Sequence, residues 1–402
     1  MSLARDLLKR LIPDPLLDAY RRHEAEAKLS DAAKQVRSEN ARGLPPADCG
    51  AARAAELAGQ WLCRAQDRST PVDGGVARHF SLNTGWSPSY PETTGYIVPT
   101  FFELARRTGK ADYAERARRM VDWLIAIQMP DGAFQGGMIT ASAVPTTFNT
   151  GQILIGLAAA AADSGAARDL DAMHRAAAWL RDNQDDDGCW RRFPSPFTKP
   201  GEKTYETHVA WGLLEAERVA PGHGYGEAAL RQMSWAAGNI RPNGWIADCC
   251  LTDPSQPLTH TLGYALRGFI EGYRFNQDAA LLSSAITVGE GLRGCVGPDG
   301  KLPGRLREDW SPAVSWVCLT GAVQNAANFL DLHAWTGEPA WRDAGLALNG
   351  FVRRTMVTEG DPDRVGAVAG SFPVDGDYGR FEYLNWAAKF LIDAQFMELD
   401  LA

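Results

Sequence analysis

The sequence predicts an all-α protein in which six helical hairpins close into a ring, an (α/α)6 toroid. The prediction rests on a 56-residue repeat and on an alternation of two classes of helix. Gly132, Gly188, Gly244 and Gly300 follow one another in steps of 56 residues, and each follows Asp or Asn. Two further series keep the same step: Trp123, Trp179 and Trp235, and Gly95, Gly151, Thr207 and Gly263. Because a repeat array can bury one continuous core, the length of the chain does not require several domains.

The first class of helix ends at the repeat turn. Its members carry one apolar stripe and an opposite face with Arg and Asp, as outer helices do. They are Ala51–Gln66, Ala111–Gln128, Ala167–Gln184, Tyr225–Ile240, Asp278–Cys295 and Pro339–Met356. The second class follows a longer loop and is rich in Gly and Ala and poor in charge, as helices contacted on all sides are. Its members are Thr93–Thr108, Thr147–Asp163, Glu206–Ala220, Thr259–Asn276, Ser315–Thr336 and Tyr383–Leu399. The alternating pattern of strands is almost absent.

The connections between the helices differ at the two ends of the predicted ring. The inner-to-outer turns are short, and Gly109 and Gly337 stand where a helix C-terminus favours a left-handed residue. The outer-to-inner loops run about 15 residues and are rich in Pro, Gly and aromatic side chains. Long loops on a short-looped scaffold usually carry function. We therefore expect the site among the long loops, near the inner-helix N-termini, whose free N–H groups favour carboxylates.

Bulk properties narrow the class of protein. The chain has 402 residues and a formal net charge of -8, which argues against nucleic acid as a main partner. Seven scattered cysteines do not form an even disulfide framework, so we expect a reducing compartment. Met1–Arg22 lacks the pattern of a secretory signal, and no stretch is apolar enough to span a bilayer. We expect a cytoplasmic protein with a charged helical arm over 1–45 and a barrel over 46–402.

The repeat also predicts which inner side chains meet. Tyr96, Gln152, His208 and Tyr264 occupy equivalent positions, so they should project into the lumen at one height. One turn towards the long loops stand Glu92, Phe148, Thr204 and His260, and one turn the other way Arg267 should face inward. Such a lumen is polar, and planar Arg side chains suit carboxylates.

The ends of the outer helices carry a recognisable motif. Trp123-Leu-Ile-Ala-Ile-Gln128 and Trp179-Leu-Arg-Asp-Asn-Gln184 are each followed by the repeat Gly and an aromatic residue, and Trp61-Leu-Cys-Arg-Ala-Gln66 is a partial copy. This resembles the repeat of the terpenoid-cyclase and prenyltransferase toroids. A physical interpretation is that the Gln amide satisfies carbonyls at its own helix end. The acidic lumen motif of such cyclases and the Asp, Cys and His set of zinc prenyltransferases have no counterpart at matching positions.

The wider toroid superfamily also contains polysaccharide lyases, uronate epimerases and six-hairpin glycosidases. Tyr90-Pro-Glu-Thr-Thr-Gly-Tyr96 and Tyr383-Leu-Asn-Trp-Ala-Ala-Lys389 are similar to segments of members found in exopolysaccharide systems. This resemblance, together with the polar lumen, implies a saccharide substrate, free or lipid-linked. The aromatic and Arg-rich loops fit an acidic sugar.

Two mechanisms suit such a substrate. In the first, of lyase or uronate-epimerase type, His208 removes the proton beside a uronate carboxylate, Tyr264 or Tyr96 supplies a proton, and Gln152 and Arg267 hold the carboxylate. In the second, two carboxylates hydrolyse a glycosidic bond. The candidate catalytic residues are His208, Tyr264, Tyr96, Glu206 and Glu92. The candidate substrate-binding residues are Gln152, Asn149, His260, Arg267, Trp190, Trp211, Trp245, Trp310, Arg307 and Asp309.

The sequence favours an enzyme and predicts no cofactor. Asp248-Cys249-Cys250 has loop placement rather than metal-ligand spacing, so no metal is predicted either. Lyase or epimerase chemistry leads, and glycoside hydrolysis is the alternative. Two further classes stay open: a terpenoid cyclase or prenyltransferase-like enzyme, and a non-catalytic saccharide-binding assembly factor. The sequence leaves the oligomeric state open.

Overall fold

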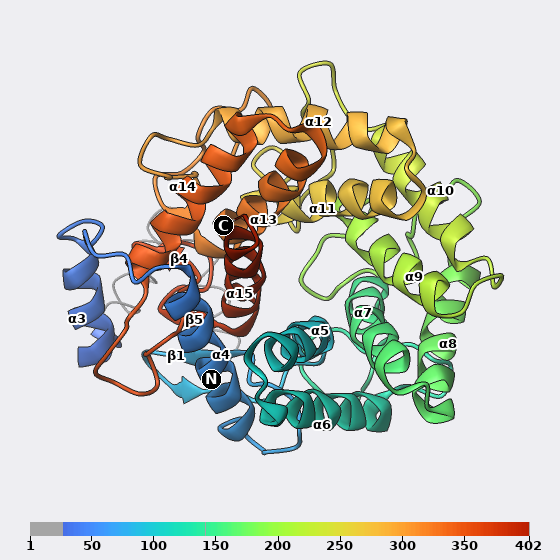
Figure 1. Ribbon diagram of the computed structural model, residues 1–402, viewed down its shortest axis with the longest axis horizontal. Coiled ribbons are helices and arrows are strands. Elements are labelled where there is room, and N and C mark those ends of the chain that lie inside the picture. The colour runs from blue at the N-terminus through green and yellow to red at the C-terminus, as the bar shows by residue number, and fades with distance from the viewer. Residues whose placement is uncertain (1–26, 141, 402) are drawn as a thin grey trace, which may run out of the picture.

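The predicted toroid is confirmed. The computed structural model describes residues 27–140 and 142–401, in which six inner helices surround the centre and six outer helices surround them (Figure 1). The inner helices are α5 (Pro91–Thr108), α7 (Thr147–Ser164), α9 (Thr207–Val219), α11 (Thr259–Asn276), α13 (Leu319–Thr336) and α15 (Asn385–Leu399). The outer helices are α4 (Ala51–Asp67), α6 (Ala111–Ile127), α8 (Ala167–Asp182), α10 (Tyr225–Ala237), α12 (Ala279–Gly294) and α14 (Pro339–Thr355).

The repeat glycines let each turn touch the next outer helix. Gly188 has a φ of +94°, and a Cβ there would lie 2.7 Å from the backbone carbonyl of Arg231 in α10. Gly132 has a φ of +96°, and its Cβ would lie 2.4 Å from the carbonyl oxygen of Arg175 in α8. Only a residue without a side chain meets both conditions, the left-handed backbone and the close approach.

The repeat glutamines also join neighbouring hairpins. Nε2 of Gln184 donates to the carbonyl of Gly188 in its own turn, at 2.9 Å, and to that of Ala228 in α10, at 2.8 Å. Gln128 and Gln66 make the same pair of bonds, to a turn carbonyl and to the next outer helix. The amides therefore do not satisfy carbonyls at their own helix ends, which corrects the interpretation made from the sequence. The 56-residue step of the repeat therefore corresponds to the step from one outer helix to the next.

The second glycine series brings the inner helices together. A Cβ at Gly95 would lie 2.4 Å from Cα of Ile153 in α7, and one at Gly151 would lie 2.8 Å from Cα of Val209 in α9. Thr207 replaces glycine at the third position, and its hydroxyl donates to the carbonyl of Ala265 at 3.1 Å. Close contact of the inner backbones narrows the lumen so that side chains from successive hairpins meet.

Short strands connect the long loops at one end of the ring. β1 (His79–Ser81) pairs antiparallel with β2 (Gly85–Trp86) and with β5 (Glu382–Leu384), and β3 (Val317–Cys318) pairs with β4 (Ser371–Phe372). Strands of two or three residues are too short to show alternation in the sequence. The β1–β5 pair joins the first hairpin to the last.

The ring closes at a seam, which we define as the contact of α4 and the segment before it with α14 and α15. Arg353 of α14 donates to both carboxylate oxygens of Asp48, at 2.7 and 2.9 Å. It also donates to Glu398 of α15 at 2.7 Å and to Gln395 at 2.6 Å. One guanidinium thus contacts the segment before the first hairpin and the end of the last one.

The described part of the predicted arm packs against the barrel. Helix α3 (Asp31–Asn40) is capped by Ser30 and buries Ala33 and Val36. The Ser30 hydroxyl also donates to the carbonyl of Leu82 at 2.6 Å, which fixes the helix to the first long loop. Residues 1–26 lie outside the described residues, and the boundary at residue 45 stays a prediction. No helix in the described ranges is long and apolar enough to cross a membrane.

Candidate functional site

The lumen contains two cavities separated by a layer of rings. A cavity of about 230 Å³ lies at the N-terminal ends of the inner helices, beneath the long loops, and we call it the long-loop cavity. A cavity of about 610 Å³ lies among the C-terminal halves of the inner helices, and we call it the short-turn cavity. Tyr96 and Tyr264 line the first and Phe390 the second, with ring centroids 5.3 and 6.1 Å apart. A cavity thus lies beneath the long loops, where the site was expected, but the larger cavity is at the other end.

Aromatic side chains make most of the wall of the long-loop cavity. The lining residues are Arg78, Tyr90, Glu92, Thr93, Tyr96, Phe148, Ser195, Phe197, Tyr205, Leu251, His260, Thr261, Tyr264, Tyr378 and Trp386. Arg78 lies 5.1 Å from the ring of Trp386 and 5.8 Å from that of Tyr90, so a cation stands within the aromatic wall. Aromatic faces beside a few charged and hydroxyl groups suit a small polar ligand.

Glu92 is the one carboxylate among the described residues that line this cavity. It stands in the first turn of α5 and accepts a hydrogen bond from the Tyr90 hydroxyl at 3.0 Å. Burial raises the pKa of Glu92 to about 7, and the Tyr90 hydrogen bond and Arg78 only partly offset this. A carboxyl with a pKa near neutrality can both donate and accept a proton at physiological pH.

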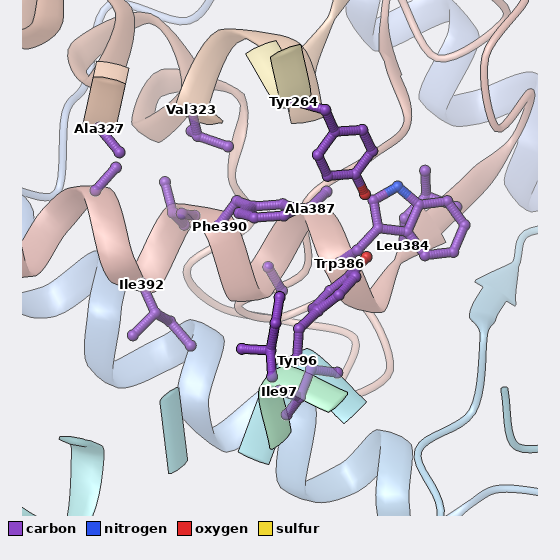
Figure 2. Packing of buried hydrophobic residues seen from close by; sticks show 14 of the residues in the cluster. Tyr96, Ile97, Tyr264, Val323, Ala327, Leu384, Trp386, Ala387, Phe390 and Ile392 are labelled. Atoms are coloured by element: carbon purple, nitrogen blue, oxygen red, sulfur yellow. The ribbon is translucent and has the colours of Figure 1, made fainter. Parts of the chain in front are cut away.

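Tyr264 lies at the centre of the ring layer. Its ring centroid is 4.4 Å from that of His260 and 4.3 Å from that of His208. Burial holds the pKa of Tyr264 well above its ordinary value, so the phenol stays protonated. Figure 2 shows Tyr96, Tyr264 and Trp386 gathered beside Phe390, with the two phenol oxygens directed to the same region.

His260 is held as a neutral imidazole. Its Nδ1 donates to Oε1 of Gln324, which leaves Nε2 as an acceptor. Burial lowers the pKa of His260 to about 4. The ring therefore carries no charge near pH 7.

The structure brings His208 and Gln152 together, as the repeat predicts. Nδ1 of His208 donates to Oε1 of Gln152 at 2.7 Å, and burial lowers the pKa of His208 well below its ordinary value. Among the described residues, His208 Nε2 and Gln152 Nε2 have no hydrogen-bond partner, and the side chain of Asn149 is fully buried. His208 lines the short-turn cavity although its ring touches Tyr264, which lines the other one.

Arg267 and Trp211 also line the short-turn cavity. Arg267 donates to Asp331 at 2.9 Å and forms an ion pair with Glu271, and its guanidinium lies 4.9 Å from the Trp211 ring. Glu271 and Asp331 neutralise this guanidinium, although its Nε has no partner among the described residues. The predicted clamp therefore lies beside two carboxylates, in a different cavity from Tyr264.

Eight predicted site residues line neither cavity: Gln152, Asn149, Glu206, Trp190, Trp245, Trp310, Arg307 and Asp309. Glu206 is buried with Oε2 unpartnered, and burial raises its pKa to about 8. The tryptophans pack within the repeat turns, where Trp190 Nε1 donates to the carbonyl of Leu180 at 2.9 Å and Trp245 lies 5.2 Å from Trp310. Arg307 donates to the carbonyl of Pro312, and Asp309 accepts from the backbone N–H of Ser311, so both shape their own loop.

Sequence reasoning assigned no role to several residues of the long-loop cavity. Tyr90 and Trp386 lie in the two segments for which the sequence resembles exopolysaccharide proteins, and both line this cavity. Arg78 and Tyr378 stand in loops without repeat partners, where periodicity gives no signal.

The described residues hold no cluster of three His, Cys, Asp or Glu side chains suited to a metal ion. All seven cysteines are free thiols. Cys249 is buried, and its thiol contacts the carbonyl of Thr261 at 3.2 Å.

Comparisons with known proteins agree on the architecture. A family model described as the squalene-hopene cyclase C-terminal domain matches residues 85–269. An unsaturated glucuronyl hydrolase specific for heparin superposes with a TM-score of 0.70 at 14% identity, over 87% of this chain and 96% of that one. Cellobiose 2-epimerase from Spirochaeta thermophila gives 0.66 at 17% identity, over 93% and 99%. The same epimerase from Bacillus thermoamylovorans gives 0.65 at 11%, over 84% and 95%.

No curated protein matches the chain. The chain is an α/α toroid, and its resemblance to the cyclase-type repeats and to the six-hairpin toroids is confirmed. At such identities the solved structures share its fold.

Proposed function

We propose that this chain is a carbohydrate-active enzyme that uses acid–base chemistry of lyase or uronate-epimerase type on an acidic sugar in the long-loop cavity. The observation that carries the proposal is Glu92, a carboxyl with a pKa of about 7 in an aromatic wall beside protonated tyrosines. Glycoside hydrolysis by a pair of carboxylates requires a second acid, and Glu92 has no such companion among the described lining residues.

The proposed roles follow from charge and position. Arg78 binds the sugar carboxylate, because it stands in the wall of the cavity and pairs only at 3.3 Å with Glu382 among the described residues, whereas Arg267 pairs with both Glu271 and Asp331. Ionised Glu92 removes the proton on the carbon beside that carboxylate, and the electron pair passes into the carboxylate. Tyr264, which remains a phenol, delivers a proton either to the leaving oxygen, giving elimination, or to the carbon from the other face, giving epimerisation. His208, predicted as the base, becomes a positioning residue behind Tyr264.

Glycoside hydrolysis is kept as the alternative because structures of unsaturated glucuronyl hydrolases match almost the whole toroid. A terpenoid cyclase or prenyltransferase fits less well. A carbocation needs a dry lumen, and this lumen contains Arg267, buried Lys389 and the ion pair of Lys389 with Asp393 at 2.6 Å. A non-catalytic saccharide-binding assembly factor would bind sugars without converting them.

The test is incubation with a panel of uronate oligosaccharides in D2O. Absorbance of a new 4,5-double bond indicates elimination, deuterium at the carbon beside the carboxylate without cleavage indicates epimerisation, and new reducing ends alone indicate hydrolysis. Glu92→Gln should lower the rate by about 10²–10⁴-fold, the usual contribution of a general acid or base. Glu227→Gln, on the exposed face of α10, is the matched control and should leave the rate unchanged. Equal rates in the two variants would contradict the role of Glu92.

We further propose that the substrate is cytoplasmic and either small or lipid-linked. Seven free thiols support a reducing compartment. Phe197 lines the long-loop cavity and is 53% exposed, so an apolar portion of a substrate can contact it at the mouth. Phe197→Ser should raise the KM for a lipid-linked uronate substrate and leave that for the free oligosaccharide unchanged. An equal effect on both would contradict the lipid contact.

A further inference from the structure

The short-turn cavity has the properties of a second ligand site, at the end of the toroid opposite the proposed active site. Its volume of about 610 Å³ falls within the range of small-molecule pockets. Arg107, Arg218 and Arg274, in the last turns of α5, α9 and α11, line its outer part, with side chains 25, 31 and 38% exposed. The cavity is therefore reached from solvent past the short turns, and the ring layer separates it from the long-loop cavity.

The cations in this cavity are accompanied by a slight excess of carboxylates. Its cations are Arg107, Arg218, Arg267, Arg274 and Lys389, and its carboxylates are Glu103, Glu215, Glu271, Asp331, Asp393 and Asp400. Every one of the five cations is paired with a carboxylate that also lines the cavity. An ionic ligand would have to break such pairs and leave a charge without its partner, which is costly in a partly buried site.

Hydroxyl groups meet no such obstacle. A carboxylate has about four acceptor positions and a guanidinium five donors, so paired side chains keep capacity for further hydrogen bonds. Arg274, for example, donates to Glu271 at 2.6 Å and to Asp331 at 2.5 Å, while all three side chains still line the cavity. A hydroxyl that donates to a carboxylate and accepts from a guanidinium leaves the net charge unchanged.

Two buried polar atoms in the wall lack a partner among the described residues, Nε of Arg267 and Nε2 of His208. His208 is 0% exposed, lines the cavity and makes its single hydrogen bond through Nδ1, so Nε2 is an unsatisfied acceptor. Buried acceptors in folded proteins nearly always have a donor from protein, water or ligand. Because the Nδ1 bond to Gln152 fixes the neutral tautomer, the missing partner is a donor such as a hydroxyl rather than an anion.

We propose that the short-turn cavity binds a neutral saccharide of one or two rings, through its hydroxyl groups, as a site separate from the long-loop cavity. The compensated ion pairs select an uncharged polyol, and His208 Nε2 accepts from one of its hydroxyls. This site goes beyond the proposed catalytic function and does not depend on it.

The test measures binding of cellobiose, maltose and sucrose to the full chain by saturation-transfer NMR, with glucuronate as the charged comparison. At least one neutral disaccharide should bind saturably, more tightly than glucuronate, with an affinity that is the same in 50 mM and 500 mM NaCl. Absence of saturable binding, or preference for glucuronate with strong salt dependence, would overturn the proposal.

Location is tested by filling the cavity. Ala159 of α7 lines it, so Ala159→Trp should weaken neutral-sugar binding at least tenfold, whereas Ala52→Trp on the exposed side of α4 should not. Ala159→Leu gives a smaller obstruction should the tryptophan variant fail to fold, and it should weaken binding in the same direction. Unchanged binding in a folded Ala159 variant would place the sugar elsewhere and overturn the proposal. Binding should persist in Glu92→Gln whether or not the chain converts uronates, which separates this inference from the catalytic one.

Discussion

The repeat glutamine gives a direct test of how the toroid is stabilised. Replacing Gln184 with Met keeps the length and volume of the side chain and removes its amide. Two hydrogen bonds of 2.9 and 2.8 Å disappear, to the carbonyls of Gly188 and Ala228. At about 1 kcal/mol for each neutral hydrogen bond, the free energy of unfolding should fall by about 2 kcal/mol. The bond from Arg231 to Gln184 Oε1 is exposed and should add little.

The size of the chain determines the assay. An unfolding entropy of about 2.1 cal/mol/K per residue means that 2 kcal/mol shifts the Tm of so large a domain by only about 2–3 °C. Urea unfolding followed by circular dichroism resolves such a change better, as a lower midpoint with an unchanged slope. Gln35→Met is the matched control, because Gln35 is exposed on α3 and bonds only to Glu39. It should change the free energy by less than about 0.5 kcal/mol.

The bond pattern also predicts additivity. Gln66, Gln128 and Gln184 serve different hairpins and share no partner, so their three Met variants combined should lose about 6 kcal/mol. A Gln184→Met protein as stable as the control would refute the reasoning that these amides join the outer helices.

Three further outcomes follow from the contacts described. Gly188→Ala should destabilise by about 1–3 kcal/mol more than Gly222→Ala in urea titrations, because both have positive φ but only the Cβ at 188 meets backbone; equal losses would show that φ alone matters. The pKa of Glu206 is about 8 in the folded chain against 4.5 in the unfolded chain. The contribution of this group to the free energy of unfolding is therefore greatest below pH 4.5 and is lost as pH rises to about 8. Wild type should lose up to about 4 kcal/mol over that range relative to Glu206→Gln, and parallel pH curves would contradict this. Arg353→Met should cost about 2–3 kcal/mol through its charged hydrogen bonds, and a smaller loss than Gln184→Met would argue against the seam as a major contact.

The helices and their order could be predicted because each repeats the same physical requirement. A turn that touches the next outer helix demands glycine at Gly132 and again at Gly188, so the spacing in the sequence is the spacing of hairpins in the ring. The same register placed Gln152 beside His208 and His208 beside Tyr264. Contacts that recur in each hairpin can therefore be predicted from the sequence without knowledge of the loops.

The site was predicted less well because it depends on loops and on contacts between helices that the repeat does not specify. Periodicity gives the height of a side chain in the lumen but does not show that a ring layer divides the lumen, so His208 and Tyr264 were expected in one pocket. Arg267 faces inward as predicted, yet Asp331 reaches it from α13, a partner that the helix pattern alone did not reveal. Trp190 and Trp245 lie in loops, where exposure cannot be inferred from position, and both are buried.

The contact of Arg353 with both Asp48 and Glu398 bears on how the protein comes apart. In an open solenoid either end can fray by itself, whereas here detaching the last hairpin also strips partners from the first. Loss of this guanidinium would loosen the seam from both sides, and hydrogen exchange would then rise in α4 and α15 at the same time.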